Sequence, residues 1–398
     1  MTKKIVRKTN KYRRAAVCMA ASVLGMSLLS GCGLGKTKAP DKDDPWLKEA
    51  RLDDDIDEEE LYKAALLEGV LTVYTVSTRA TKTKEVFEKT YPGLCVEIRD
   101  LRSPDLIDAV KKSYEEDLMD VDVVICNDNS GDFKSTLVDT GAVVPYIPAD
   151  IKDKMKEGHL EECVSFLDEA ELLFYNTGKY DSPPISNIWE LTEKEYEGRI
   201  YIPNPLRSFS TYAFVGSSFD HEKELKEAYE DYYEKTYESD KGSISEFLWK
   251  EISKNAVFTN SSDEVMEALN SDAADVGIMV SSKLRYREVG YTISPIYRLE
   301  PFCGSRTSFA VMMGRNSKNV NAAKLFIRCL LGDEDGQGDG YKPFCTAGTW
   351  SARVDVSDGN DVPLEEADLI IPDQDYLIKN RKYMEEFWTK CFENKVGD

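Results

Sequence analysis

Short apolar runs alternate with stretches of helical periodicity over most of this chain. Residues 70–76, 95–98 and 121–126 are the first three runs, and each is rich in Val and Ile or other strand-forming residues. Runs this short favour a strand over a helix, because helices with an apolar face are usually longer. Strands that alternate with helices predict an α/β fold with parallel sheets.

Polar loops follow these predicted strands. The carboxyl ends of parallel strands meet at one edge of a sheet, and ligands bind there. We therefore predict a binding site made in part by the residues that follow the three runs, which are Ser77, Thr78, Arg79, Arg102, Ser103, Asn127 and Asn129.

The same pattern begins again after residue 176. At 398 residues the chain suits two domains. We predict lobe one from residues 61–174 and 303–345, and lobe two from residues 175–302 and 346–398. In the second half, the polar residues placed after predicted strands or at the return crossover are Arg207, Ser208, Ser210, Thr211, Asn260, Ser261, Ser305, Arg306 and Thr307.

The first 31 residues differ from the rest, with seven Lys or Arg, no acidic residue and an apolar run at 15–29. A basic segment, a short apolar core and small residues before a cleavage point predict a signal peptide. The run ends in LSGC, which resembles the bacterial lipoprotein signal. This resemblance implies that Cys32 is the lipidated residue, with residues 32–60 as an acidic tether at the outer face of the cell membrane.

The net charge of −22 limits the classes of partner. Nucleic-acid backbones need clustered Lys and Arg, and this surface repels polyanions, so we expect no nucleic acid to bind.

Catalytic and cofactor signatures are weak. The chain has two histidines, His159 and His221, and no CxxC spacing for a zinc or redox site. The segment at Gly216 and Ser217 lacks the second glycine of a nucleophile elbow. We therefore expect a protein that is not an enzyme and needs no cofactor.

The order of these segments resembles the solute-binding proteins of the ferric-ion-binding type, a branch of the type II periplasmic binding fold. The resemblance spans roughly residues 61–388 and is carried by LYKAALLEGVLTVYT at 61–75, VFEKTYPGLCVEI at 86–98, DVVIC at 122–126, FYNTG at 174–178, IWELTEKEYEGRIYIPNP at 188–205, ISKNAVFTNSSDEVMEAL at 252–269, ADVGIM at 274–279 and SKNVNAAKLFIRCLLG at 317–332. It implies two α/β lobes joined by crossover hinges, a monomer that closes on a small-molecule ligand, and delivery to the permease subunits of an ABC importer.

Ferric-binding members of that family carry a tyrosine pair after the strand matching residues 275–279. Here Val280 and Ser281 follow instead, which argues against direct iron binding. Iron stays the second ligand hypothesis, with Tyr286 and Tyr291 as its ligands.

The predicted loops favour an anionic or polar solute, such as an organophosphate, phosphonate or carboxylate. Hydroxyl groups and free backbone N–H groups at helix starts bind anions. Ordinary helix capping explains the same Ser and Thr residues equally well. A sensory co-receptor that reports its ligand to a membrane signalling protein is an alternative role.

Overall fold

A computed structural model of the protein describes residues 44–118, 120–238 and 242–396. The predicted signal peptide, Cys32 and the first part of the tether lie outside these residues. The strands are β1 (Leu71–Thr75), β2 (Val96–Asp100), β3 (Val123–Asn127), β4 (Val143–Val144), β5 (Ser165–Asn176), β6 (Ile200–Pro203), β7 (Ala256–Thr259), β8 (Val276–Val280), β9 (Ile293–Pro295), β10 (Gly304–Gly314), β11 (Trp350–Ser351) and β12 (Leu369–Ile370).

The α-helices are α1 (Pro45–Ala50), α2 (Glu58–Ala65), α3 (Ala80–Thr90), α4 (Ser103–Glu115), α5 (Ala149–Lys152), α6 (Phe209–Ser218), α7 (Glu222–Tyr233), α8 (Ile244–Asn255), α9 (Ser262–Asn270), α10 (Val320–Leu330) and α11 (Gln374–Val396). The 3-10 or π-helical segments are η1 (Lys134–Val138), η2 (Ile188–Thr192), η3 (Lys194–Tyr196), η5 (Ser281–Val289), η6 (Lys342–Phe344) and η7 (Leu364–Glu366).

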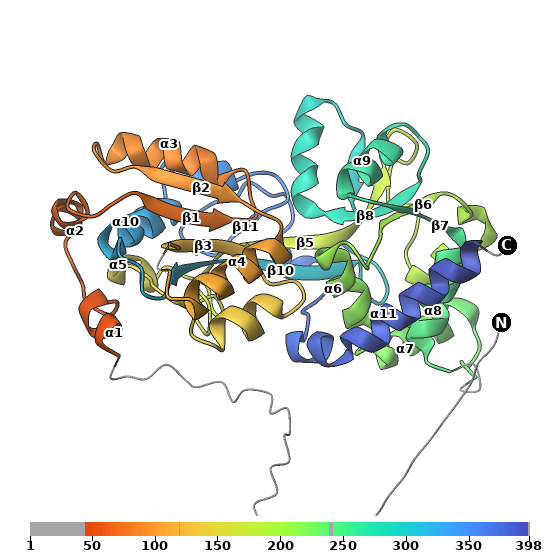
Figure 1. The fold of residues 1–398 in the computed structure, drawn as a ribbon. Coiled ribbons are helices and arrows are strands. Elements are labelled where there is room, and N and C mark those ends of the chain that lie inside the picture. Colours follow the sequence, from red (N-terminus) through yellow and green to blue (C-terminus); the bar gives the residue numbers. More distant parts are fainter. Residues whose placement is uncertain (1–43, 119, 239–241, 397–398) are drawn as a thin grey trace, which may run out of the picture. The chain divides into compact units, whose positions relative to one another are not determined.

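One mixed sheet, in the order β2-β1-β3-β10-β5-β8-β6-β7, runs through both lobes. The strands β2, β1 and β3 are parallel in lobe one, and β8, β6 and β7 are parallel in lobe two. The long strands β5 and β10 are antiparallel to each other and join the two parallel sets. Figure 1 shows β5 and β10 between the group of β1 to β3 and the group of β6 to β8. The predicted α/β fold with crossover hinge segments is confirmed.

Apolar residues fill separate cores in the two lobes. In lobe one, alternate residues of β3 face opposite sides of the sheet, with Val123 and Ile125 in one core cluster and Val124 and Cys126 in another. This two-sided burial explains why the strand is an unbroken apolar run. The core of lobe two is built on β5 from Ala170 onward, together with α6, α8 and α11.

We predicted lobe boundaries at residues 174/175, 302/303 and 345/346, and the core clusters show on which side of the hinge the residues near them pack. The first crossing lies inside β5, since Leu167 belongs to a lobe-one core and Ala170 to the lobe-two core. The return lies inside β10, between Cys303 and Phe309. Apolar periodicity could not locate the crossing inside β5, because every residue of this strand is buried.

The segment after residue 345 also differs from its predicted place in lobe two. Trp350 and Ser351 form β11 against Asp168 and Leu167 of β5, and the backbone N–H of Ala352 donates to the carbonyl of Phe166. This segment therefore extends the part of β5 that belongs to lobe one. The chain enters lobe two for the second time near Ile370, which lies in the lobe-two core.

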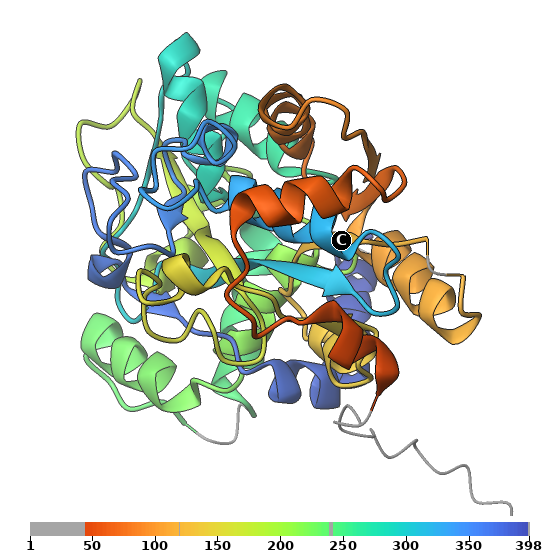
Figure 2. The same cartoon turned by 90° about the vertical axis from the view of Figure 1, so that its left-hand side faces the viewer.

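Residues 44–60 are not the solvated tether that their composition predicts. Asp44 caps α1 and forms an ion pair with Arg315 at 2.5 Å, and the indole N–H of Trp46 donates to the carbonyl of Ser317 at 2.9 Å. Figure 2 views the molecule from the end that carries α1 and α2, and both helices lie at the front. Lys324 Nζ also donates to the carbonyl of Arg51, and Leu47, Leu52 and Ile56 pack against the core of lobe one. The few apolar residues among many acidic ones gave no clear signal of this docking in the sequence.

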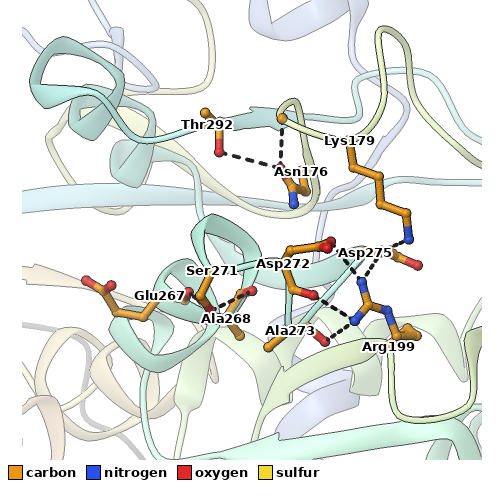
Figure 3. Close-up of polar contacts among 11 residues, drawn as sticks. Asn176, Lys179, Arg199, Glu267, Ala268, Ser271, Asp272, Ala273, Asp275 and Thr292 are labelled. Carbon is orange, nitrogen blue, oxygen red and sulfur yellow. Dashed lines mark hydrogen bonds and ion pairs between the residues drawn. The ribbon is translucent and has the colours of Figure 1, made fainter.

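A polar cluster joins the amino ends of β6 and β8 in lobe two (Figure 3). Asp275 Oδ1 accepts from Arg199 Nη2 at 2.6 Å and from Lys179 Nζ at 2.7 Å, and Arg199 Nη1 also donates to the carbonyls of Asp272 and Ala273. Burial favours the neutral form of the Asp275 carboxyl, but its two cationic partners outweigh this effect and hold its pKa below the ordinary value. The cluster lies at the opposite strand ends from the predicted ligand loops, so its role is structural.

Candidate functional site

Two adjoining cavities lie where the carboxyl ends of the parallel strands of both lobes meet. The Asn129 cavity, of about 300 Å³, is lined by Val76, Ser77, Arg79, Ser103, Asn127, Asn129, Glu169, Phe209, Ser210, Val280 and Phe309. The Arg102 cavity, of about 560 Å³, is lined by Val76, Asp100, Leu101, Arg102, Ser103, Pro104, Arg207 and Phe209. They share Val76, Ser103 and Phe209, and together we call them the cleft.

The cleft gathers residues from the ends of four strands, where the sequence analysis placed polar loops or helix starts. Lobe one contributes the ends of β1, β2 and β3, and lobe two contributes the residues after β6. The predicted site residues that line it are Ser77, Arg79, Arg102, Ser103, Asn127, Asn129, Arg207 and Ser210. Asn127 is the last residue of β3, and each of the others sits two to seven residues after a strand, as the parallel arrangement requires.

Arg79 is fixed by three kinds of contact. Its Nη2 donates to Glu169 Oε1 at 2.7 Å, its Nε donates to Ser77 Oγ at 3.1 Å, and its guanidinium lies 4.9 Å from the ring centre of Phe344. Both members of the ion pair are largely buried. Because Glu169 balances its charge, Arg79 offers the cavity directed N–H groups without net positive charge.

The hinge strand β5 brings two carboxyl groups to this region, Glu169 and Glu171. Glu171 is fully buried, and its Oε1 accepts from Thr211 Oγ1 at 2.7 Å. Burial raises the pKa of Glu171 to about 7, and the nearby charge of Glu169 adds to the shift. Glu171 therefore exchanges its proton close to neutral pH and links the hinge strand to the start of α6.

The Arg102 cavity has basic groups on both sides. Arg102 comes from lobe one, directly before α4, and Arg207 comes from lobe two, two residues before α6. Their hydrogen-bond partners lie outside the cavity lining: Arg102 Nε donates to Asp105 at 3.0 Å, and Arg207 Nη1 donates to Asn260 at 3.2 Å. Burial raises the pKa of Asp100, the acidic residue in this lining.

Other predicted residues support the helices next to the cleft. Ser208 caps α6, and its Oγ accepts from the backbone N–H of Thr211. Ser261 caps α9 in the same way, and Asn260 accepts from Arg207. Thr78 is exposed and lines neither cavity. For Ser208 and Ser261, helix capping is the role the structure shows.

The predicted residues of β10 lie elsewhere. Ser305 is buried opposite Glu171 in the hinge. Arg306 and Thr307 line a different cavity of about 330 Å³. There Arg306 Nη2 forms an ion pair with Asp168 of β5 at 2.8 Å. Arg306 is therefore not a cleft residue.

The two tyrosines named for iron also lie outside the cleft lining. The hydroxyl group of Tyr291 donates to Glu267 at 2.6 Å. Its ring packs edge-on against that of Tyr286, with 5.5 Å between the ring centres. Their hydroxyl groups therefore do not join the cleft residues.

Several lining residues were missed from sequence, namely Val76, Glu169, Phe209, Val280 and Phe309. A signal existed for Glu169, because acidic residues interrupt the otherwise apolar run at 165–176. Charged residues inside a buried strand are rare without a specific partner, and that pattern marks the hinge.

Within the described ranges no group of three or more His, Cys, Asp or Glu side chains is arranged to hold a metal ion. None of the helices in the described part of the chain is both long enough and apolar enough to cross a bilayer.

The family model of the bacterial extracellular solute-binding proteins matches residues 85–337, which is more than half of the chain. The chain belongs to this family. No curated protein sequence matches it.

Solved structures share its fold over 81% of its length. They include AfuA from Actinobacillus pleuropneumoniae with exogenous fructose-6-phosphate bound (17% identity, 98% of that chain, TM-score 0.60), iron-bound HitA from Pseudomonas aeruginosa (14%, 99%, 0.57) and an ABC transporter protein from Clostridium perfringens (13%, 99%, 0.57). At these identities the likeness establishes the fold, and the two-lobed type II periplasmic binding fold is confirmed.

Proposed function

We propose that this solute-binding protein captures a small anionic solute in the cleft and delivers it to the permease subunits of an ABC importer. One observation carries the proposal: Arg102 of lobe one and Arg207 of lobe two line the same cavity. An anion between them gains charge-assisted hydrogen bonds from both lobes. Binding then favours the closed arrangement, which is the signal that a permease can recognise.

The neighbouring folds are consistent with two ligand classes. AfuA was solved with a sugar phosphate and HitA with iron. The first class suits the arginines and hydroxyl groups of this cleft. The second finds little support, because Tyr286 and Tyr291 are not part of the cleft lining.

We also propose that the protein acts as a monomer held at the outer face of the cell membrane through a lipid on Cys32. The support is the basic leader, the short apolar run and the LSGC sequence. Cys32→Ala should leave the protein unprocessed or release it, as membrane fractionation would show. Lipid labelling that persists in this variant would contradict the proposal.

Calorimetry on the purified protein tests the anion site. Arg207→Ala should weaken binding of an organophosphate or carboxylate ligand about tenfold or more, because a charge-assisted hydrogen bond is lost. Arg298→Ala is the matched control, since Arg298 is an exposed arginine of lobe two outside the cleft lining. Tight binding of free ferric ion that is unchanged in Arg207→Ala but lost in Tyr286→Phe would contradict the proposal.

Uptake assays separate import from sensing. Loss of uptake of labelled solute on gene deletion supports the importer role. Unchanged uptake with a lost transcriptional response would point to the co-receptor role instead.

A further inference from the structure

Two residues that line the Asn129 cavity each carry a buried polar atom that has no hydrogen-bond partner among the described residues. The atoms are Arg79 Nη1 and Asn129 Oδ1. Both residues line the cavity, and Asn129 is only 7% exposed. Buried polar atoms in folded proteins nearly always have a partner, so these two atoms indicate a missing ligand or ordered water.

The two unpaired atoms have opposite requirements. Arg79 Nη1 is a donor and needs an acceptor, whereas Asn129 Oδ1 is an acceptor and needs a donor. A carboxylate or fully ionised phosphate cannot donate to Asn129. An ammonium group or a bare metal ion cannot accept from Arg79. A hydroxyl group satisfies both requirements, since it donates once and accepts twice.

The remaining lining of this cavity matches hydroxyl groups as well. Glu169 balances the charge of Arg79 at 2.7 Å, so no net positive charge favours an anion here. Ser77, Asn127 and Ser210 add hydroxyl and amide groups from both lobes. Phe209 and Phe309 give apolar faces that suit the C–H groups of a carbon chain.

The size of the Asn129 cavity also favours an organic ligand with hydroxyl groups. A volume of about 300 Å³ is the lower end of what organic ligands occupy, and is far more than a single oxyanion or metal ion needs. The Arg102 cavity adjoins it through Val76, Ser103 and Phe209. One ligand can therefore reach from the arginines to Asn129.

We infer that the solute is a hydroxylated anion, a phosphorylated or carboxylated polyol or sugar, whose charged end binds in the Arg102 cavity and whose hydroxyl groups bind Arg79 and Asn129. This inference rests on the proposed function and adds the chemical class of the solute. It also assigns Asn129 as a residue that selects for hydroxyl groups.

Calorimetry on the wild-type protein tests the inference with ligands that differ in one property. Sorbitol 6-phosphate, glucose 6-phosphate, fructose 6-phosphate and gluconate carry both charge and hydroxyl groups. n-Hexyl phosphate keeps a six-carbon chain and the charge without hydroxyl groups, and sorbitol keeps the hydroxyl groups without the charge. At least one hydroxylated anion should bind about 100-fold more tightly than n-hexyl phosphate, because unpaired buried groups strongly reject a ligand that lacks their partner.

The outcomes distinguish the two proposals. Equal affinity for n-hexyl phosphate and the best hydroxylated anion overturns this inference and leaves the anion site intact. Equal affinity for sorbitol and sorbitol 6-phosphate overturns the anion site, and with it the charged end of the inferred solute, and leaves only the selection for hydroxyl groups standing. If none of the hydroxylated anions binds, the inference is wrong.

Substitution of Asn129 gives a second test. Asn129→Ala should lose at least about tenfold in affinity for the hydroxylated anion and little for n-hexyl phosphate, since only the former uses the amide oxygen. Asn129→Ser keeps an uncharged oxygen acceptor at this position and should recover part of the affinity. Thermal unfolding of each variant checks that it is folded. An equal loss for both ligands in Asn129→Ala would contradict the assigned role.

Discussion

At the scale of single residues, Arg353 explains a loop whose composition imitates a calcium site. The sequence from Asp333 to Gly340 alternates acidic residues and glycines. Arg353 Nη1 donates to the carbonyls of Leu331 and Asp333 at 2.8 and 2.6 Å, and its Nη2 donates to the carbonyl of Glu334 at 2.9 Å. The carbonyl groups of this loop thus accept hydrogen bonds from the cationic guanidinium group of Arg353.

We predict that Arg353→Met lowers the free energy of unfolding by about 3 kcal/mol, since several buried carbonyl groups lose a charged donor. Thermal or urea unfolding measures the change. Arg298→Met is the control, because Arg298 is 65% exposed and its ion pairs should contribute less than about 1 kcal/mol. Similar losses in the two variants would show that the loop does not depend on Arg353.

Glu171 predicts a pH dependence of stability. Its pKa in the folded protein, about 7, lies above the ordinary value of 4.5, so folding favours the protonated form. Its contribution is therefore complete below about pH 4.5 and is lost as the pH rises through 7. Glu171→Gln should raise the free energy of unfolding relative to wild type at pH 8, by up to about 3 kcal/mol, and not at pH 4.

Urea unfolding at both pH values measures this difference. Glu97→Gln, at an exposed position, should show no comparable dependence. A stability difference between wild type and Glu171→Gln that is the same at pH 4 and pH 8 would contradict the raised pKa.

At the scale of elements, short strands were more predictable than long ones. An apolar run in the sequence marks each of the short strands β1, β2, β3, β6, β7 and β8. The eight predicted cleft residues lie at or after the ends of four of them, β1, β2, β3 and β6. The sequence did not reveal the crossing inside β5, because a continuously buried strand has no periodicity to mark where one lobe ends. Ser305 and Arg306 were predicted to lie in the binding site, but they belong to β10. Neighbouring residues of a strand point to opposite faces, so the two residues do not share one site.

The helix α11 connects lobe two to the loop after β3. Arg381 forms a bidentate ion pair with Asp132, at 2.8 and 2.7 Å, and its Nη2 also donates to the carbonyl of Ser130. Gln374 Nε2 donates to the carbonyl of Asp128 at 3.0 Å. The loop that carries Asn127 and Asn129 is thus held from lobe two on the side away from the cleft lining.

We predict that Arg381→Gln increases amide hydrogen exchange in residues 128–135 by about tenfold, because local opening becomes easier by roughly 1.4 kcal/mol. Mass spectrometry of exchanged peptides measures this. Lys382→Gln is the control, since Lys382 is next to Arg381 in the sequence and its own side chain is 90% exposed. Unchanged exchange in Arg381→Gln would show that the loop is held by other contacts.

At the scale of the whole molecule, the chain passes between the lobes three times, through β5, through β10 and between β11 and Ile370. The sheet is continuous across the hinge, since β5 and β10 pair with each other along both lobes. Loss of either lobe breaks strands that the other lobe requires.

We predict a single unfolding transition for both lobes. Calorimetry should give a van't Hoff enthalpy equal to the calorimetric enthalpy, as expected for one cooperative unit. The test needs no variant, although the ligand must be absent, because binding shifts the transition temperature. Two resolved transitions would show that each lobe unfolds independently.

The path of the chain also fixes when folding can be completed during synthesis. Lobe one contains β1 near its beginning and β11 at Trp350–Ser351, and the core of lobe two includes Trp388 and Cys391. Neither lobe has all its strands and helices until most of the polypeptide has left the ribosome. Because domains fold as units, a growing chain of this order remains unfolded through most of its translation. An unfolded chain is the form that a secretion channel can thread, and here the order of strands along the sequence maintains that form.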